Sequence, residues 1–173
     1  MLRPASSADG LLGKQNLYEH SVRVPFILRG PGVPRGERRD TLAYSLDLYA
    51  TLCELTGVPA PAGLDSRSLV PAFRSEAPAV RDEVFAVYMD CQRMVTDGRW
   101  KRIVYYVEGA ERVQLFDLAS DPHELHNLAD DPASGGHLGR LAARLAQWQE
   151  DEGDTWMRAT LAVPAAEEPA DRE

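Results

Sequence analysis

The sequence is poor in cysteine, in basic charge and in long apolar runs, and each shortage excludes a class of protein. Two cysteines among 173 residues are too few for a disulfide framework, so Cys53 and Cys91 are expected to be buried free thiols. The net charge of −8 argues against a nucleic-acid partner, which requires basic patches. No apolar run approaches the roughly 18 residues of a membrane span. The start of the chain lacks the apolar stretch of a signal peptide. The composition is typical of a soluble globular protein and leaves its compartment unknown.

Composition divides the chain into two regions between polar ends. Residues 1–10 are small and polar, and residues 163–173 alternate alanine, proline and acid, so both ends are expected to be disordered. Serine, alanine and proline between Arg74 and Arg81 indicate a linker. The sequence therefore predicts one unit over residues 11–75 and another over residues 80–160.

The first unit, residues 11–75, has the pattern of an α/β arrangement. The apolar run 25–28, bounded by glycine and proline, predicts a buried strand. Three leucines at i, i+4 and i+7 predict a helix that has Asp47 as its N-cap and ends at Gly57. A short second helix is expected over residues 69–73.

The second unit contains four short β-rich segments followed by an amphipathic helix. The segments are residues 83–89, 91–96, 100–107 and 113–118. Asp97-Gly98 is a hairpin signal between the second and the third, and strands joined so tightly must be antiparallel. A helix over residues 138–150 carries one apolar stripe. The pattern predicts a small four-stranded antiparallel sheet with a C-terminal helix laid on it.

Two residues near the start of the first unit are candidates for chemistry. Lys14 lies in a loop ahead of the predicted strand, and in open α/β sheets ligands bind in loops at strand ends. Its ammonium could meet an anion, although a lysine considered alone is more often a solvated surface charge. His20 is either hydrogen-bonded within the loop or placed at the rim of a substrate site.

A histidine pair near residue 125 has both a metal-binding and a structural interpretation. His123 and His126 are three residues apart, whereas a zinc helix of the H-E-x-x-H kind spaces its histidines by four. Asp121 as N-cap, Pro122 at the first helical position and Glu124 at the third would form a capping box. The structural interpretation is favoured over a metal site.

Several motifs resemble those of sulfatases, in the alkaline-phosphatase-like superfamily. They are the Lys14-bearing stretch 13–32, the stretch 63–71, the stretch 93–101 (RMVTDGRWK) and the stretch 115–129 with its Asp-Pro-x-Glu-x-x-Asn pattern. The resemblance spans roughly residues 10–160. It implies the C-terminal portion of a sulfatase: the remnant of an alkaline-phosphatase-like α/β domain, followed by a small α+β subdomain.

The resemblance also implies roles for individual residues. In sulfatases the matching lysine touches the sulfate oxygens, which makes Lys14 the expected catalytic and substrate-binding residue and places His20 near the substrate. The family's nucleophile is a formylglycine made at the head of a Cys/Ser-x-Pro-x-Arg motif, and carboxylates and an Asn hold its metal, usually calcium. Neither Cys53 nor Cys91 begins that motif, and the ligands expected before Lys14 are missing. We therefore expect no cofactor in this chain and no activity alone, as from a truncated gene, a split gene or a late start codon.

Three hypotheses about function remain open. The first is a sulfuric ester hydrolase portion, whose complete form acts on a small sulfate ester or a sulfated sugar. The second is a non-catalytic interaction module that completes the cleft of a separately encoded N-terminal half. The third is part of a related phosphatase or phosphonate hydrolase. In each case residues 11–75 should expose apolar surface and be marginally stable, because the strands that would flank residues 25–28 are missing.

Overall fold

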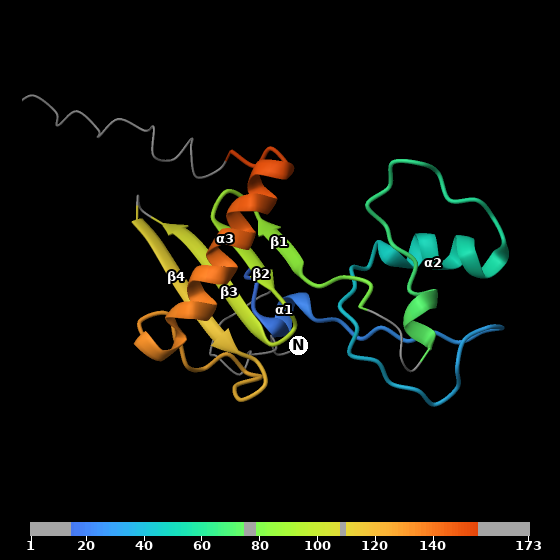
Figure 1. The fold of residues 1–173 in the computed structure, drawn as a ribbon, viewed down its shortest axis with the longest axis horizontal. Coiled ribbons are helices and arrows are strands. Elements are labelled where there is room, and N and C mark those ends of the chain that lie inside the picture. Colours follow the sequence, from blue (N-terminus) through green and yellow to red (C-terminus); the bar gives the residue numbers. More distant parts are fainter. Residues whose placement is uncertain (1–14, 75–78, 108–109, 156–173) are drawn as a thin grey trace, which may run out of the picture.

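The computed structural model describes residues 15–74, 79–107 and 110–155, which form two lobes (Figure 1). We call residues 15–22 together with residues 80–155 the sheet lobe, and residues 24–74 the helix lobe. The ends expected to be disordered, residues 1–10 and 163–173, lie outside the described residues. The division into units at about residue 75 stays a prediction. Within the described ranges, no helix is both long enough and apolar enough to cross a bilayer.

Four consecutive strands form the antiparallel sheet in the order β1-β2-β3-β4. They are β1 (Val84–Tyr88), β2 (Gln92–Thr96), β3 (Trp100–Val107) and β4 (Ala110–Asp117). The turn between β2 and β3 forms because Asp97 Oδ1 accepts hydrogen bonds from the backbone N–H groups of Arg99 and Trp100, at 2.9 and 2.7 Å. Gly98 supplies the positive φ of 91° that this turn requires. The predicted four-stranded sheet is confirmed.

One face of the sheet is covered by the C-terminal helix α3 (Gly135–Asp151), drawn in orange in Figure 1. The short 3₁₀ helix η2 (Pro132–Ser134) leads into it. Two buried leucines of α3 meet one inward residue from each of the strands β2, β3 and β4; these five residues are Val95, Val104, Leu115, Leu141 and Leu145. The predicted packing of a C-terminal helix on the sheet is confirmed, and the helix begins three residues earlier than expected.

The opposite face is covered by residues 15–22, which come from far upstream in the sequence. They contain the single-turn helix α1 (Glu19–Val22). Leu17 packs there against Met94, Ile103 and Phe116. Each of these three strand residues is adjacent in the sequence to a residue that faces α3, because successive side chains along a strand point to opposite faces. The sheet is therefore apolar on both faces, and residues 15–22 share a core with it.

The helix lobe contains α2 (Asp47–Thr56) and the short 3₁₀ helix η1 (Val70–Phe73). Gly57 ends α2 in the left-handed conformation, with a φ of 71°, as predicted. The prediction for Asp47 is wrong, because Leu46 is the N-cap and Asp47 is the first helical residue. Asp47 is fully buried, since its carboxylate binds partners elsewhere in the chain.

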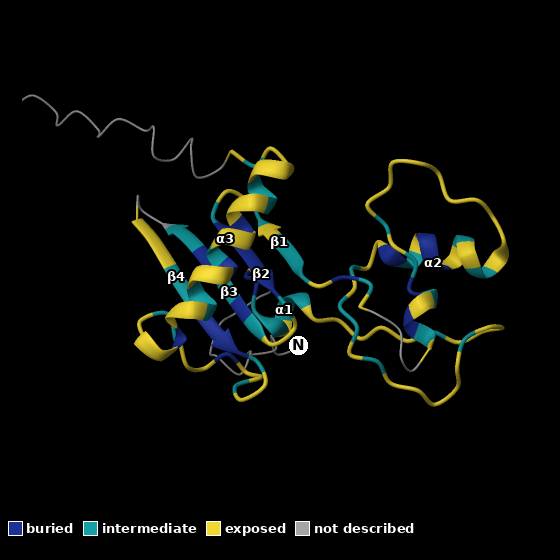
Figure 2. Cartoon of the chain, viewed as in Figure 1, coloured by how far each residue is buried: buried dark blue, intermediate teal, exposed yellow. Residues whose placement is uncertain are grey.

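The predicted strand at residues 25–28 is also wrong. These residues pair with no strand in the described part of the chain, and their side chains are exposed, with Phe26 at 46% and Ile27 at 88%. Further apolar side chains are exposed in the same lobe, as the yellow segments of Figure 2 illustrate: Val24, Leu46, Tyr49, Leu52, Val58 and Leu64. The expected exposure of apolar surface in this region is therefore observed.

No helix begins at Asp121, so the predicted capping box is wrong. The chain turns there instead, and the backbone N–H of Glu124 donates to the carbonyl of Asp121 at 3.1 Å. Glu124 has a φ of 56°, which is uncommon for a residue with a side chain. That conformation turns the Glu124 side chain into the sheet lobe, where it is 1% exposed.

Candidate functional site

Lys14 lies outside the described residues, but the segment that follows it directly is described. Lysine is rare in this chain: of its 19 basic lysine and arginine residues, only Lys14 and Lys101 are lysines. Lys101 is on β3 and is completely buried. Lys101 contacts Glu19 in the segment that begins one residue after Lys14.

Residues 15–22 are attached to the sheet by contacts along most of their length. Gln92 Nε2, on β2, donates to the carbonyl oxygen of Gln15 at 3.3 Å. The Tyr18 hydroxyl donates to Gln114 Oε1, on β4, at 2.8 Å. Leu17 is 4% exposed in the apolar core between these two contacts. The segment is thus attached to two different strands.

The same segment also holds its own shape. Asn16 Oδ1 accepts a hydrogen bond from the backbone N–H of Tyr18 at 3.2 Å and another from the Ser21 hydroxyl at 2.7 Å. The backbone N–H of Val22 donates to the carbonyl of Tyr18 at 3.0 Å, which closes the turn of α1. Because residues 15–22 have both internal hydrogen bonds and contacts with the sheet, their backbone has one defined position on the sheet.

A buried cluster of ions lies where this segment meets β3. Lys101 Nζ is 3.0 Å from Glu19 Oε1 and 2.8 Å from Glu124 Oε1. The backbone N–H of Glu19 donates to Glu124 Oε2 at 2.5 Å. Arg23 Nη1 lies 3.8 Å from Glu19 Oε2 on the exposed side, so two cations accompany two carboxylates. We call Glu19, Lys101 and Glu124 the buried triad.

Burial raises the pKa of the Glu124 carboxyl above its usual range, although the neighbouring Lys101 ammonium and the N–H of Glu19 act against this. A buried carboxylate is costly unless charged and hydrogen-bonded partners surround it. The triad therefore holds together only while residues 15–22 stay on the sheet and supply Glu19.

The buried triad is not predicted by any of the motifs described above, although one feature of the sequence pointed to it. Lys101 shares a face of β3 with Ile103 and Tyr105, because side chains alternate along a strand. A lysine among apolar residues on an inward face must pair with a carboxylate if it is buried. The identity of that carboxylate could not be read locally, because Glu19 is 82 positions from Lys101 in the sequence.

The other predicted site residue, His20, is exposed on α1. Its ring stacks on that of Tyr18, with centroids 5.8 Å apart and planes 18° from parallel. It therefore lies beside the attached segment, and its role near a substrate stays a prediction. His126 Nδ1 is 3.5 Å from Asp121 Oδ2, while His123 is exposed in the same turn.

No metal cage is built from the part of the chain that the structure describes. Across residues 15–74, 79–107 and 110–155, no three histidine, cysteine, aspartate or glutamate side chains gather closely enough to hold an ion. The residues present do not fit the calcium site of the family, so no step involving a metal is assigned to them. Both cysteines are free thiols, and each is half-buried rather than fully buried as expected.

A second buried ion pair joins the two lobes. Arg81 forms a bidentate pair with Asp47: Nε donates to Oδ2 at 2.9 Å and Nη2 donates to Oδ1 at 2.6 Å. Its guanidinium also lies over the ring of Tyr44, 4.6 Å from the centroid. The Tyr44 hydroxyl accepts from the N–H of Phe85 at 2.6 Å and donates to its carbonyl at 3.0 Å. Both backbone groups of Phe85, on the edge strand β1, therefore have a hydrogen-bond partner.

The charge state of this junction follows from its partners. Burial by itself would raise the pKa of the Asp47 carboxyl, but hydrogen bonds from Arg81 and from the N–H groups of Arg67 and Tyr44 outweigh it and lower the pKa below its usual range. Burial raises the pKa of the Tyr44 hydroxyl. Asp47 is therefore a carboxylate at neutral pH, as its pairing with Arg81 requires.

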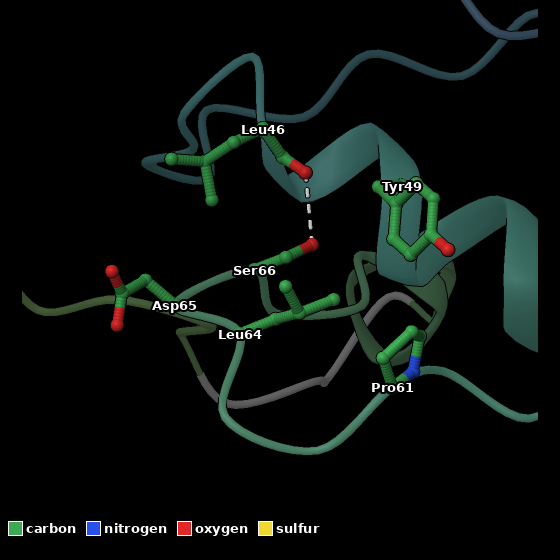
Figure 3. Close-up of a pocket in the computed structure, with 6 residues that line it drawn as sticks. All are labelled: Leu46, Tyr49, Pro61, Leu64, Asp65 and Ser66. Carbon is green, nitrogen blue, oxygen red and sulfur yellow. Dashed lines mark hydrogen bonds between the residues drawn. The ribbon is translucent and has the colours of Figure 1, made fainter.

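The helix lobe contains a shallow apolar hollow of about 370 Å³ (Figure 3). Its lining includes Leu46, Tyr49 and Leu64, all of which are largely exposed. Ser66 donates from its hydroxyl to the carbonyl of Leu46 at 2.8 Å and so fixes one wall. The lining includes one charged residue, Asp65, and resembles an uncovered protein surface more than a site for a sulfate anion.

Known proteins are similar to this chain in sequence and in fold. The profile of the family described as N-sulphoglucosamine sulphohydrolase, C-terminal, matches residues 8–151. Arylsulfatase K of Rattus norvegicus is 32% identical over 132 residues, which are 68% of this chain and 23% of that protein. Choline-sulfatase of Rhizobium meliloti (strain 1021) is 33% identical over 164 residues, which are 88% of this chain and 31% of that protein.

A solved structure described as a 2-O GAG sulfatase aligns with a TM-score of 0.70 and 30% identity, covering 89% of this chain and 34% of that one. The chain thus spans between about a quarter and a third of the length of these relatives. The matched profile includes Lys14, the whole sheet and α3. The chain therefore belongs to the N-sulphoglucosamine sulphohydrolase C-terminal family and corresponds to the C-terminal portion of a sulfatase, with the alkaline-phosphatase-like fold.

Proposed function

We propose that this chain supplies the C-terminal part of a sulfuric ester hydrolase, in which Lys14 contacts the sulfate group of the substrate. The family match over residues 8–151, which includes Lys14, is the observation that carries the proposal. The attachment of residues 15–22 to the sheet supports it, because a group that meets a reacting anion must start from a defined backbone. The complete protein is expected to act on a small sulfate ester or a sulfated sugar.

A lysine suits the chemistry of a sulfate ester. When the S–O bond breaks, negative charge grows on the leaving oxygen and stays spread over the sulfuryl oxygens. An ammonium group is a compact point charge with three donors, and it can follow that charge without a fixed planar geometry. His20, exposed beside the segment, is the next residue expected to meet the substrate.

Activity assays test the proposal directly. The 173-residue chain, supplied with calcium and an aryl sulfate, should show no turnover, because the family's nucleophile and metal ligands are not found in it. Added to a polypeptide that carries the Cys/Ser-x-Pro-x-Arg half, it should restore turnover, and Lys14→Ala should lower kcat by about 10²- to 10³-fold.

Arg38→Ala is the matched control, because Arg38 is also a basic residue of this chain and its side chain is 84% exposed. It should leave turnover unchanged. Turnover by the 173-residue chain alone would overturn its inactivity, and equal kcat values for Lys14→Ala and Arg38→Ala would overturn the role of Lys14. Faster turnover of the matching aryl phosphate than of the aryl sulfate would show that phosphate esters are the substrates.

A second candidate function is an interaction module that completes the cleft of a separately encoded partner. The exposed apolar side chains of the helix lobe and the hollow in Figure 3 favour it, because isolated soluble chains rarely expose contiguous apolar surface. Sedimentation of the chain with the polypeptide carrying the nucleophile motif should show a stable one-to-one complex. If the two sediment independently, this candidate fails.

A further inference from the structure

We propose that Lys101 and Glu124 are positioning residues: through Glu19 they lock residues 15–22 onto the sheet and so hold Gln15, to which Lys14 is joined, at a fixed place. This inference rests on the proposed function of Lys14. It assigns a purpose to two residues of the sheet lobe that are too deeply buried to meet a substrate.

The geometry of the buried triad carries the inference. Glu19 is held twice, by its side chain against Lys101 Nζ at 3.0 Å and by its backbone N–H against Glu124 Oε2 at 2.5 Å. The two contacts come from different elements: Lys101 is on β3, and Glu124 is in the turn that follows β4. A residue held at both its backbone and its side chain cannot rotate or slide without breaking one of them.

The distance from the triad to Lys14 is short along the chain. Four residues lie between Lys14 and Glu19, and three of them, Gln15, Leu17 and Tyr18, contact the sheet. Consecutive Cα atoms are about 3.8 Å apart, so a fixed Gln15 limits where the Cα atom of Lys14 can lie. Movements of about 1 Å at a reacting group are enough to lower a rate by about a hundredfold.

The charges of the buried triad explain why residues 15–22 are held on the sheet. Lys101 is 0% exposed, and it can be charged there only with carboxylates beside it. Glu124 supplies one carboxylate from within the sheet lobe, and Glu19 supplies the other from residues 15–22. Lifting residues 15–22 would open Lys101 to solvent and remove one of its two partners, so the ion pair favours the closed arrangement.

Glu19→Ala is the sharpest variant, because it cuts the side-chain link while the pair of Lys101 and Glu124 remains. Hydrogen exchange at the amides of Ser21, Val22 and Arg23 should become faster by about ten- to a hundredfold, as expected for losing one charged hydrogen bond. Exchange within β2 and β3 should stay as in the wild type. Glu19→Gln keeps an acceptor oxygen and should recover part of the protection.

The scarcity of lysine provides a second readout. Lys14 and Lys101 are the only lysines, so peptide mass spectrometry follows the acetylation of each ammonium group separately. In the wild type Lys101 should resist the reagent, and in Glu19→Ala it should react at least about tenfold faster. Arg93→Met is the control, because Arg93 forms a buried pair with Asp154 at 2.6 Å on the α3 face of the same sheet. It should leave Lys101 protected.

The outcomes separate this inference from the proposed function. Unchanged exchange at residues 21–23 and continued resistance of Lys101 in Glu19→Ala would overturn the positioning role, whatever Lys14 does. The same result in Arg93→Met as in Glu19→Ala would also overturn it, because the effect would then be general loosening. Full kcat in Lys14→Ala, with the expected exchange results, would overturn the proposed function and leave the lock of residues 15–22 standing.

Discussion

The sheet lobe and the helix lobe both contain large apolar side chains but bury them very differently. In the sheet lobe both faces of one sheet are covered, by α3 on one side and residues 15–22 on the other. In the helix lobe α2 and η1 leave apolar side chains such as Ile27 and Leu52 exposed. The difference shows that a short chain can complete one core while a neighbouring lobe is left with surface that suits a partner.

The junction between the lobes should show the largest single effect. Arg81→Met leaves the fully buried Asp47 carboxylate without its cation, which should lower the free energy of unfolding by about 3–5 kcal/mol. The described tryptophans, Trp100 and Trp148, are both in the sheet lobe. In urea, circular dichroism should therefore change before tryptophan fluorescence does, as the helix lobe unfolds first.

Arg99→Met is the matched control for that junction. Arg99 also pairs with an aspartate, Asp117, but its side chain is 64% exposed. Its loss should cost much less stability than the loss of Arg81, because solvent screens an exposed pair. Equal losses in Arg81→Met and Arg99→Met would contradict the importance of burial at the junction.

A pair of identical substitutions measures the contrast between the lobes. Leu141→Ala removes a side chain that is 0% exposed between α3 and the sheet, and should cost about 2–5 kcal/mol. Leu52→Ala removes one that is 48% exposed on α2, and should change stability by under about 0.5 kcal/mol. Urea unfolding of both variants checks this. Similar losses in the free energy of unfolding would show that the Leu52 side chain is buried in a core.

The two lobes should also respond to pH with opposite signs. The pKa of Asp47 is below its ordinary 3.8, so the stability it contributes is complete above that pH and is lost as pH falls through the folded pKa. The pKa of Glu124 is above its ordinary 4.5, so the folded chain binds that proton more tightly and stability falls as pH rises from 4.5 through the folded pKa.

Urea midpoints measured between about pH 3 and 7 test both signs. Asp47→Asn should flatten the acid side of the profile, and Glu124→Gln should flatten the fall above 4.5. A Glu124→Gln profile that keeps the wild-type shape would show that this carboxyl does not titrate in the range.

The smallest effect on stability is expected at the most exposed apolar residue. Ile27→Asp should change the free energy of unfolding by under about 0.5 kcal/mol, because its side chain is 88% exposed. It should nevertheless weaken the complex with a polypeptide that carries the nucleophile motif, measured by sedimentation. Unweakened binding would show that the apolar surface of the helix lobe is not the interface.

Local patterns were sufficient for much of the fold. The β-rich segments and the apolar stripe of α3 predicted the sheet and its covering helix, and Asp97-Gly98 predicted the turn between two strands. The strand at residues 25–28 failed because an apolar run becomes a strand only where a neighbour pairs with it, and none lies in the described part of the chain.

The candidate site was less predictable than the fold. The pattern at Asp121 to Glu124 satisfies the local rule for a capping box, yet Glu124 instead reaches Lys101 on β3. Asp47 satisfies the rule for an N-cap, yet it binds Arg81, 34 positions away. In both cases the carboxylate binds a buried cation together with backbone N–H groups from elsewhere in the fold, and no local pattern records these partners.

The sequence by itself determined where the four strands of the sheet, the turn between β2 and β3 and the helix α3 form, because these depend on side-chain periodicity and backbone preferences within a few residues. Only the tertiary structure decided which charges meet: Glu19 with Lys101, and Asp47 with Arg81. Ionic partners are selected by which segments the fold brings together and seals from water, and that choice is made across the whole chain.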